Sequence, residues 1–231
     1  MSDTQYADVP IRDAATVILL RHDQAEPSVL MGQRGKNAVF MPNKFVFPGG
    51  GLDASDADVA FAGLPEAACM ARLTQGCDDR TAKGLIGAAI REVWEETGHP
   101  LARQDPSAAA DATNQPIGWQ DFFSHGYRPS AHGLTFVFRA ITPPGRPRRF
   151  DARFFLGDAA LIDGDLDDFS RAEDELAHLQ WVPLSKTRDF DLPFITEVVL
   201  AEVQNRVENP DADHAVPFFS HDGDRSRFEK L

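Results

Sequence analysis

The sequence has few cysteines, no long hydrophobic run and a shortage of basic residues. Cys69 and Cys77 are the two cysteines among 231 residues. They are too few for a disulfide framework and fit a reducing compartment. No apolar run approaches the roughly 20 residues needed to cross a bilayer, and residues 1–12 are polar, without the apolar core of a signal peptide. We therefore expect a cytoplasmic protein without a membrane partner.

The charge balance is strongly acidic, with 36 Asp and Glu against 23 Lys and Arg and a formal net charge of -13. Nucleic acid needs a basic surface, so it is not expected as the main partner. The composition, 42% hydrophobic and 26% charged, is that of a globular protein, and the length suits one compact domain over residues 1–231. An anionic substrate would require something that cancels the repulsion.

Hydrophobic patterning predicts a mixture of strands and helices. Strands are expected at 15–20, 28–33, 45–47, 134–141, 149–156 and 179–182, and helices at 65–73, 81–97, near 119–123, and at 192–207. Residues 48–51 are expected to break regular structure, and 209–231 to form a partly ordered C-terminal tail. Strands around two long helices indicate an α/β (α+β) fold with a mixed sheet between helices.

The helix at 81–97 carries an unusual set of carboxylates. Glu92, Glu95 and Glu96 fall within an arc of about 100° on one face. Three carboxylates this close repel one another unless a hard divalent cation lies between them, and Mg²⁺ prefers such oxygen ligands. Arg91 lies one turn before Glu95 and is placed to pair with it. Taken alone, the triplet would be read as an ordinary solvated face of an amphipathic helix.

Two segments change that interpretation: FPGGGLD at 47–53 and REVWEETG at 91–98. Together they resemble the motif of the Nudix hydrolase superfamily. In the usual motif the Arg follows the second Gly by fourteen positions, whereas 41 positions separate Gly50 from Arg91 here, an insertion of 27 residues. We place this insertion at 57–83, just after Asp56, which stands at the motif's early acidic position. Loop-closure cost grows slowly with length, so such an insertion is tolerable.

The split motif and the basic, Phe-rich segment at 147–155 are similar to the Nudix branch that contains the peroxisomal coenzyme A diphosphatase. The upstream coenzyme A signature is incomplete, because Val39 stands where a second Arg is expected. The sequence ends in Glu-Lys-Leu, and a peroxisomal address needs a small residue where Glu229 stands.

The resemblance implies a Nudix-type α/β/α sandwich and a set of site residues. The implied metal ligands for Mg²⁺ or Mn²⁺ are Glu92, Glu95, Glu96 and the carbonyl of Gly49. The general base would be Glu96 or Glu175, with Arg91 orienting the carboxylates. Gly50 and Gly51 would let the backbone approach substrate phosphates, because glycine has no Cβ.

Arginines cluster in the predicted hairpin around residue 149. Arg148, Arg149 and Arg153 are candidates for binding substrate phosphates, since guanidinium groups bind phosphate in bidentate fashion. The alternative is a charged hairpin that pairs with the nearby acidic segment. Aromatic residues such as Phe40 and Trp119 are candidates for stacking an adenine, although core roles are the more common outcome for such residues.

The resemblance implies hydrolysis of a pyrophosphate bond in a nucleoside diphosphate linked to another group. Coenzyme A or acyl-coenzyme A is the first candidate, and ADP-ribose or a dinucleotide is the second. A non-catalytic Nudix-fold binding or regulatory module is the alternative from another class. A small nucleotide-type molecule is the expected partner. Nudix proteins are often dimeric, so a homodimer is kept open beside a monomer.

Overall fold

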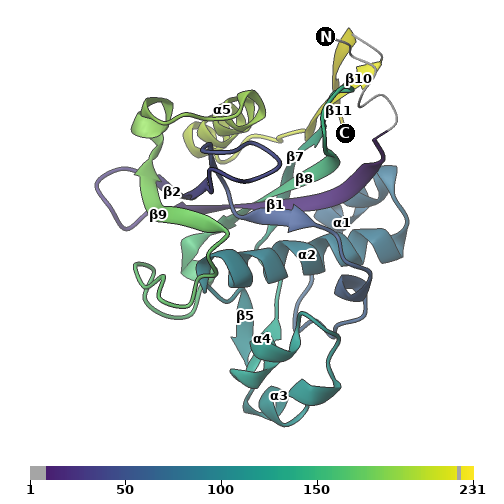
Figure 1. The fold of residues 1–231 in the computed structure, drawn as a ribbon, viewed down its shortest axis with the longest axis vertical. Helices are drawn as coiled ribbons and strands as arrows, with labels where there is room; N and C mark the ends of the chain where they lie inside the picture. The colour runs from purple at the N-terminus through teal and green to yellow at the C-terminus, as the bar shows by residue number, and fades with distance from the viewer. Residues whose placement is uncertain (1–8, 223–224) are drawn as a thin grey trace.

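The computed structural model describes residues 9–222 and 225–231, and shows a mixed sheet between two helical layers (Figure 1). Its strands are β1 (Ile11–Arg21), β2 (Ser28–Arg34), β3 (Phe45–Val46), β4 (Gly49–Gly51), β7 (Thr135–Ile141), β8 (Arg149–Asp158), β9 (Leu176–Pro183), β10 (Pro217–Asp222) and β11 (Arg225–Lys230). The order is β11-β10-β7-β8-β1-β2-β3, with β4 paired to β1 and β9 to β2. The β1–β8 and β7–β10 pairs are parallel and the others antiparallel, so the predicted mixed sheet is confirmed.

Helices cover both faces of this sheet. One face carries α1 (Ala67–Leu73) and α2 (Asp79–Thr97), and the other carries α5 (Phe194–Glu208). Beyond α2 lies a small lobe made of β5 (Ala102–Gln104), α3 (Pro106–Ala110), α4 (Gln120–Ser124) and β6 (Tyr127–Pro129) (Figure 1). Within the described residues, no helix has the length and apolar character to span a bilayer. The expected α/β/α sandwich is confirmed.

The central strand β1 explains why its sequence is apolar without alternation. Val17 and Leu19 pack with the residues of α2, while Ile18 and Leu20 pack with those of α5. All four side chains are buried. Successive side chains of a strand point to opposite faces, so a strand covered on both sides is apolar at every position.

Helix α2 is fixed at both ends by local sequence. The Asp78 side chain accepts a hydrogen bond from the Thr81 N–H at 2.7 Å, which caps the N-terminus. Gly98 ends the helix with φ of 76°, and its N–H donates to the Trp94 carbonyl at 2.8 Å. These two stops place the three glutamates on the last turns of α2.

Two segments predicted to be irregular are more ordered than expected, and the insertion, with its predicted helix at 65–73, packs into the core. Residues 49–51 form β4, because a run without Cβ atoms can lie against β1: a Cβ on Gly49 would be 2.7 Å from the Thr16 Cα. The insertion at 57–83 contains α1 and buries Val59 and Leu73 against the core. In the C-terminal segment, β10 pairs with β7 and β11 with β10, so the described residues there extend the sheet.

Candidate active site

Arg91 lies at the centre of the candidate site, with its side chain 7% exposed. Its Nε and Nη2 donate to the two carboxylate oxygens of Asp56 at 2.9 and 3.0 Å. Its Nη1 donates to Glu92 and to Glu95, both at 2.9 Å, and its Nη2 also donates to the Gly51 carbonyl at 3.0 Å. The predicted Arg91–Glu95 pair is confirmed. One guanidinium therefore joins the glycine loop, the start of the insertion and α2.

Asp56 belongs to the short 3₁₀ helix η1 (Ala54–Ala57) and is fully buried. Besides Arg91, its carboxylate accepts from Trp119 Nε1 at 3.1 Å and from the Asp53 N–H at 2.9 Å. A carboxylate with this many donors is satisfied without a metal ion. The insertion leaves Asp56 in a fixed position, and Trp119 supports it from the core and has no exposed face for an adenine.

Glu92 points at the glycine loop. A Cβ added to Gly50 would collide with the Glu92 carboxylate, so only glycine fits at this position with the side chain as it stands. Burial, the main cause, raises the pKa of Glu92 to about 7, although the neighbouring Arg91 acts in the opposite direction. Because Gly50 has no side chain, the Glu92 carboxylate of α2 can lie directly against β4.

Glu96 is almost completely buried, at 2% exposure. Its Oε2 accepts a hydrogen bond from the Gly49 N–H at 2.8 Å, whereas its Oε1 is buried without a hydrogen-bond partner. Burial, and then the charge of Glu92, raise the pKa of Glu96 well above its usual range. A buried carboxylate oxygen without a partner is costly, and a cation is one group that would satisfy it.

The three predicted glutamate ligands do not all converge. Glu95 is turned toward Arg91 and is the most exposed of the three, at 27%. Across residues 9–222 and 225–231, no three acidic, His or Cys side chains are arranged to hold a metal ion. Glu92 and Glu96 are directed at the glycine loop, while Glu95 would have to leave Arg91 to join them.

Glu175 approaches the site from the segment before β9. The Glu173 N–H donates to the Glu95 carbonyl at 2.8 Å, which attaches this segment to the end of α2. Glu175 itself accepts from Arg34 Nη2 at 2.9 Å. The charge of Glu175 acts to raise the pKa of both Glu92 and Glu96. The structure therefore brings Glu175 near the α2 carboxylates, paired with a residue that was not predicted for the site.

The three candidate phosphate-binding arginines separate in the structure. Arg148 lines a pocket of about 460 Å³ together with Arg34, Lys36 and Glu175. Arg149 donates from Nε to the Thr142 carbonyl at 3.1 Å, across the β7–β8 turn.

Arg153 does not fit the predicted phosphate-binding role. Its side chain is 2% exposed and pairs with Asp13 and with Asp151, the latter at 3.2 Å. Asp13 and Asp151 face each other in the parallel β1–β8 register. A buried cation beside both carboxylates offsets their repulsion, so the pairing of Asp151, which is buried, with Asp13, which is 39% exposed, explains this arginine.

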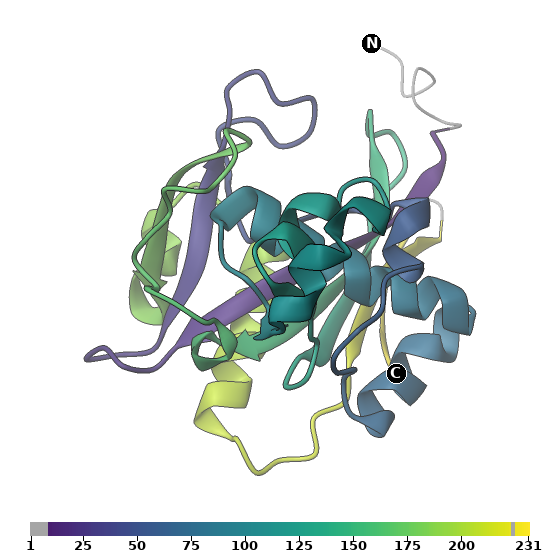
Figure 2. The ribbon, with the colours of Figure 1, turned by 90° about the horizontal axis from the view of Figure 1, so that it is seen from below.

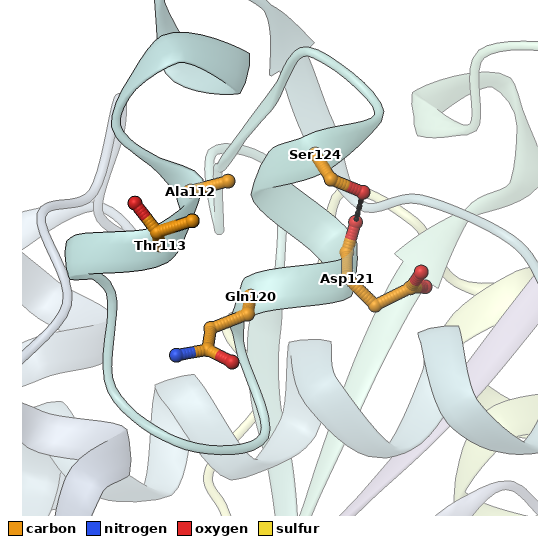
Figure 3. A pocket seen from close by; sticks show the side chains of 5 residues that line it. All are labelled: Ala112, Thr113, Gln120, Asp121 and Ser124. Carbon is orange, nitrogen blue, oxygen red and sulfur yellow. Dashed lines mark hydrogen bonds between the residues drawn. The ribbon is translucent and has the colours of Figure 1, made fainter.

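The pocket beside Glu175 was missed by sequence reasoning. Its signal is the short basic run Arg34-Gly35-Lys36 at the end of β2. Phe40 lies in the loop that follows and packs edge-on against Phe150, with ring centroids 5.3 Å apart. A second hollow, on the α3–α4 lobe, is lined by Ala112, Thr113, Gln120, Asp121 and Ser124 (Figure 3). Its lining contains no cation.

Comparisons with known proteins find Nudix hydrolases among the proteins similar to this chain. No protein-family model matches the chain. A curated Caenorhabditis elegans protein named as a Nudix hydrolase is 29% identical over 181 residues, which cover 74% of this chain and 51% of that protein. The chain therefore spans about half the length of this relative. A crystal structure of a Nudix hydrolase from Alicyclobacillus acidocaldarius matches with a TM-score of 0.61 and 28% identity, covering 84% of this chain and 91% of that one.

These comparisons support the Nudix hydrolase superfamily, a class of enzymes, as the assignment of this chain. The coenzyme A branch is not established by them.

Proposed function

We propose that this protein is a metal-dependent diphosphatase that hydrolyses the pyrophosphate bond of coenzyme A or acyl-coenzyme A. The observation that carries the proposed diphosphatase activity is the closed motif: Arg91 brings Asp56, Gly51 and the α2 glutamates together although the motif is interrupted in sequence. Coenzyme A is proposed as the substrate on the resemblance of the split motif. A non-catalytic binding module has no need for carboxylates buried in this way, since their burial is costly.

The residues fit a divalent cation, Mg²⁺ or Mn²⁺. Glu92 and Glu96 point to the glycine loop, and the Oε1 atom of Glu96 is buried without a partner. The Gly49 carbonyl, and Glu95 once it turns away from Arg91, would complete the proposed oxygen ligands, which are the donor type that these cations prefer. When bound, such a cation polarises phosphoryl oxygens and lowers the pKa of water. It also reverses the local sign of charge in a protein whose net charge is -13.

The chain's own groups would act around this centre as follows. A water oxygen attacks one phosphorus, the bond to the bridging oxygen breaks, and a carboxylate receives the water proton. Glu96 is the first candidate for that base, because the Gly49 N–H fixes its orientation at 2.8 Å. Glu175 is the second candidate, being more exposed and paired with Arg34. Arg91 acts as a positioning residue: it holds Glu92 in place and pairs with Glu95 in the absence of a cation.

The test is a substrate panel in Mg²⁺ and Mn²⁺, containing coenzyme A, acetyl-coenzyme A, ADP-ribose and NADH. The proposal expects release of a phosphopantetheine and an adenosine bisphosphate from coenzyme A. Cleavage of ADP-ribose or NADH alone would replace it with the second candidate. Tight nucleotide binding without turnover of any substrate would favour the non-catalytic module.

A further inference from the structure

The pocket next to Glu175 is built from three separate parts of the chain. The end of β2 and the loop after it supply Arg34 and Lys36, the β7–β8 turn supplies Arg148, and the segment before β9 supplies Glu175. In Figure 2 the β2–β3 loop and the β7–β8 turn both extend past the same end of the sheet. The volume of about 460 Å³ lies in the range of small-molecule sites.

The charge of this pocket is opposite to that of the protein. Three cationic side chains face one carboxylate, in a chain with a net charge of -13. Arg34 pairs with Glu175 at 2.9 Å, and its Nε is buried without a hydrogen-bond partner. For Lys36 and Arg148, no carboxylate of the described residues lies within ion-pair distance. The pocket therefore has cationic groups in excess of the anion that it holds.

The pocket adjoins the carboxylates of α2. Glu175, which pairs with Arg34 at 2.9 Å, lies two residues after Glu173, whose N–H donates to the Glu95 carbonyl near the end of α2 at 2.8 Å. A molecule whose pyrophosphate lies at Glu92 and Glu96 would thus have part of its remainder beside Arg34. The pocket is a continuation of the candidate active site.

We propose that this pocket binds a phosphate monoester on the substrate, separate from the pyrophosphate that is cleaved. The inference rests on the proposed function and specifies its substrate class: a nucleotide with an additional phosphate, as on the 3′-oxygen of the adenosine of coenzyme A. A phosphate monoester carries a charge of about -1.5 to -2 at neutral pH, which matches an excess of two cations. Arg34 and Arg148 offer guanidinium groups for its oxygens, and Lys36 offers a point charge.

The lining argues against a neutral group as the occupant. No aromatic ring lines the pocket, and the nearby Phe40 is engaged edge-on with Phe150. The lining therefore offers no ring on which an adenine could stack. An unphosphorylated ribose carries no negative charge that could pair with the three cationic side chains. Glu175, the one acid in the lining, pairs with Arg34, and a bound phosphate monoester would compete with it for this guanidinium.

The proposal can be tested without catalysis by comparing the affinities of two nucleotides for the protein. Calorimetry would compare adenosine 3′,5′-bisphosphate with AMP, which lacks the 3′-phosphate, for the wild type, Lys36→Gln, Arg148→Gln and Arg146→Gln. Arg146 lies in the same turn, exposed and outside the pocket lining, so it is a matched control. We expect the bisphosphate to bind about tenfold more tightly or better, and each pocket variant to lose most of that preference. Equal binding, no binding, or a preference that both pocket variants retain would overturn the proposal.

Kinetics separates this inference from the proposed function. Coenzyme A and dephospho-coenzyme A differ by the 3′-phosphate alone, so the ratio of their kcat/KM values reports on the pocket. We expect coenzyme A to be favoured by tenfold or more, with the ratio falling toward one in Lys36→Gln and Arg148→Gln but not in Arg146→Gln. Equal cleavage of both substrates would overturn the inference and leave the diphosphatase intact. Cleavage of neither, with the binding preference present, would overturn the proposed activity alone.

Discussion

Arg91 and Asp56 form a two-pronged ion pair across 35 positions of sequence. The N–O distances are 2.9 and 3.0 Å, and both side chains are less than a tenth exposed. Asp56 stands just before the insertion and Arg91 two-thirds along α2, so this pair closes the interrupted motif. A bidentate contact of this kind fixes orientation as well as distance.

Removing the acid of this pair is expected to destabilise the protein. Asp56→Asn would leave the buried guanidinium without its bidentate partner, and breaking a buried pair costs about 3–5 kcal/mol. Part of that is offset here, because Arg91 keeps Glu92 and Glu95. We expect a loss of about 2–4 kcal/mol in the free energy of unfolding, measured with urea.

Asp53→Asn is the matched control for that experiment. Asp53 approaches the same guanidinium at 3.9 Å but is 63% exposed, and exposed ion pairs contribute at most about 1 kcal/mol. If the two substitutions cost the same, the buried pair would not be what stabilises the motif.

Loss of a carboxylate on α2 should affect turnover more than folding. In Glu95→Gln and Glu96→Gln we expect kcat to fall by roughly two orders of magnitude or more, with the circular dichroism spectrum unchanged. Near-full activity in Glu96→Gln would remove Glu96 as ligand and base and leave Glu175 as the candidate base.

Cation binding should be visible as a shift of the melting temperature. A ligand that binds the native state stabilises it by mass action, and 1 kcal/mol shifts Tm by about 2–4 °C for a chain of this size. We expect Mg²⁺ or Mn²⁺ at saturation to raise Tm of the wild type by several degrees. In Glu96→Gln the shift should be much smaller, while Tm without metal should not fall, since the substitution removes a carboxylate whose charge is disfavoured by burial. An equal shift in both proteins would contradict a site at Glu96.

The helix and strand positions were largely predictable, because their causes are local. Residues adjacent in sequence determine the continuous apolar run of β1, the N-terminal cap of α2 at Asp78 and the end of α2 at Gly98. The site was predictable where a motif segment could be recognised, in the glycine loop, at Asp56 and on α2, which the structure brings together. Arg153 was assigned to substrate because its partner Asp13 is 140 positions away in sequence. The pocket with Arg34 and Lys36 was missed because its walls come from three distant segments.

The glycine loop offers a test of the close approach between β4 and α2. Gly50→Ala places a methyl group against the Glu92 carboxylate, which must turn away. The obstacle is the flexible end of a side chain, so we expect the fold to persist and kcat/KM to fall at least tenfold. Gly51→Ala has room, with the nearest atom 4.0 Å away, and should have the smaller effect. The reverse order of effects, in steady-state kinetics, would contradict this placement of Glu92.

His99 is expected to make the stability of the protein depend on pH. It is 3% exposed, packs against Phe169 with ring centroids 5.1 Å apart, and its Nε2 is buried without a hydrogen-bond partner. Burial lowers its pKa below the usual 6.5, although the Leu166 backbone and the charge of Asp168 act in the opposite direction. The native state therefore binds a proton at His99 less readily than the unfolded chain does. The contribution of neutral His99 to the free energy of unfolding is present above about pH 6.5 and is lost as the pH falls below that value.

The measurement is the free energy of unfolding at pH 7.5 and 5.5 for the wild type and His99→Asn. Other groups titrate in this window, but they are common to both proteins, so the difference between the two pH dependences isolates His99. We expect the wild type to lose up to about 1.4 kcal/mol per pH unit more than the variant below pH 6.5. Parallel pH profiles would mean that the native state binds the protonated imidazole of His99 as well as the unfolded chain does. That result would contradict the prediction, because the buried Nε2 has no hydrogen-bond acceptor.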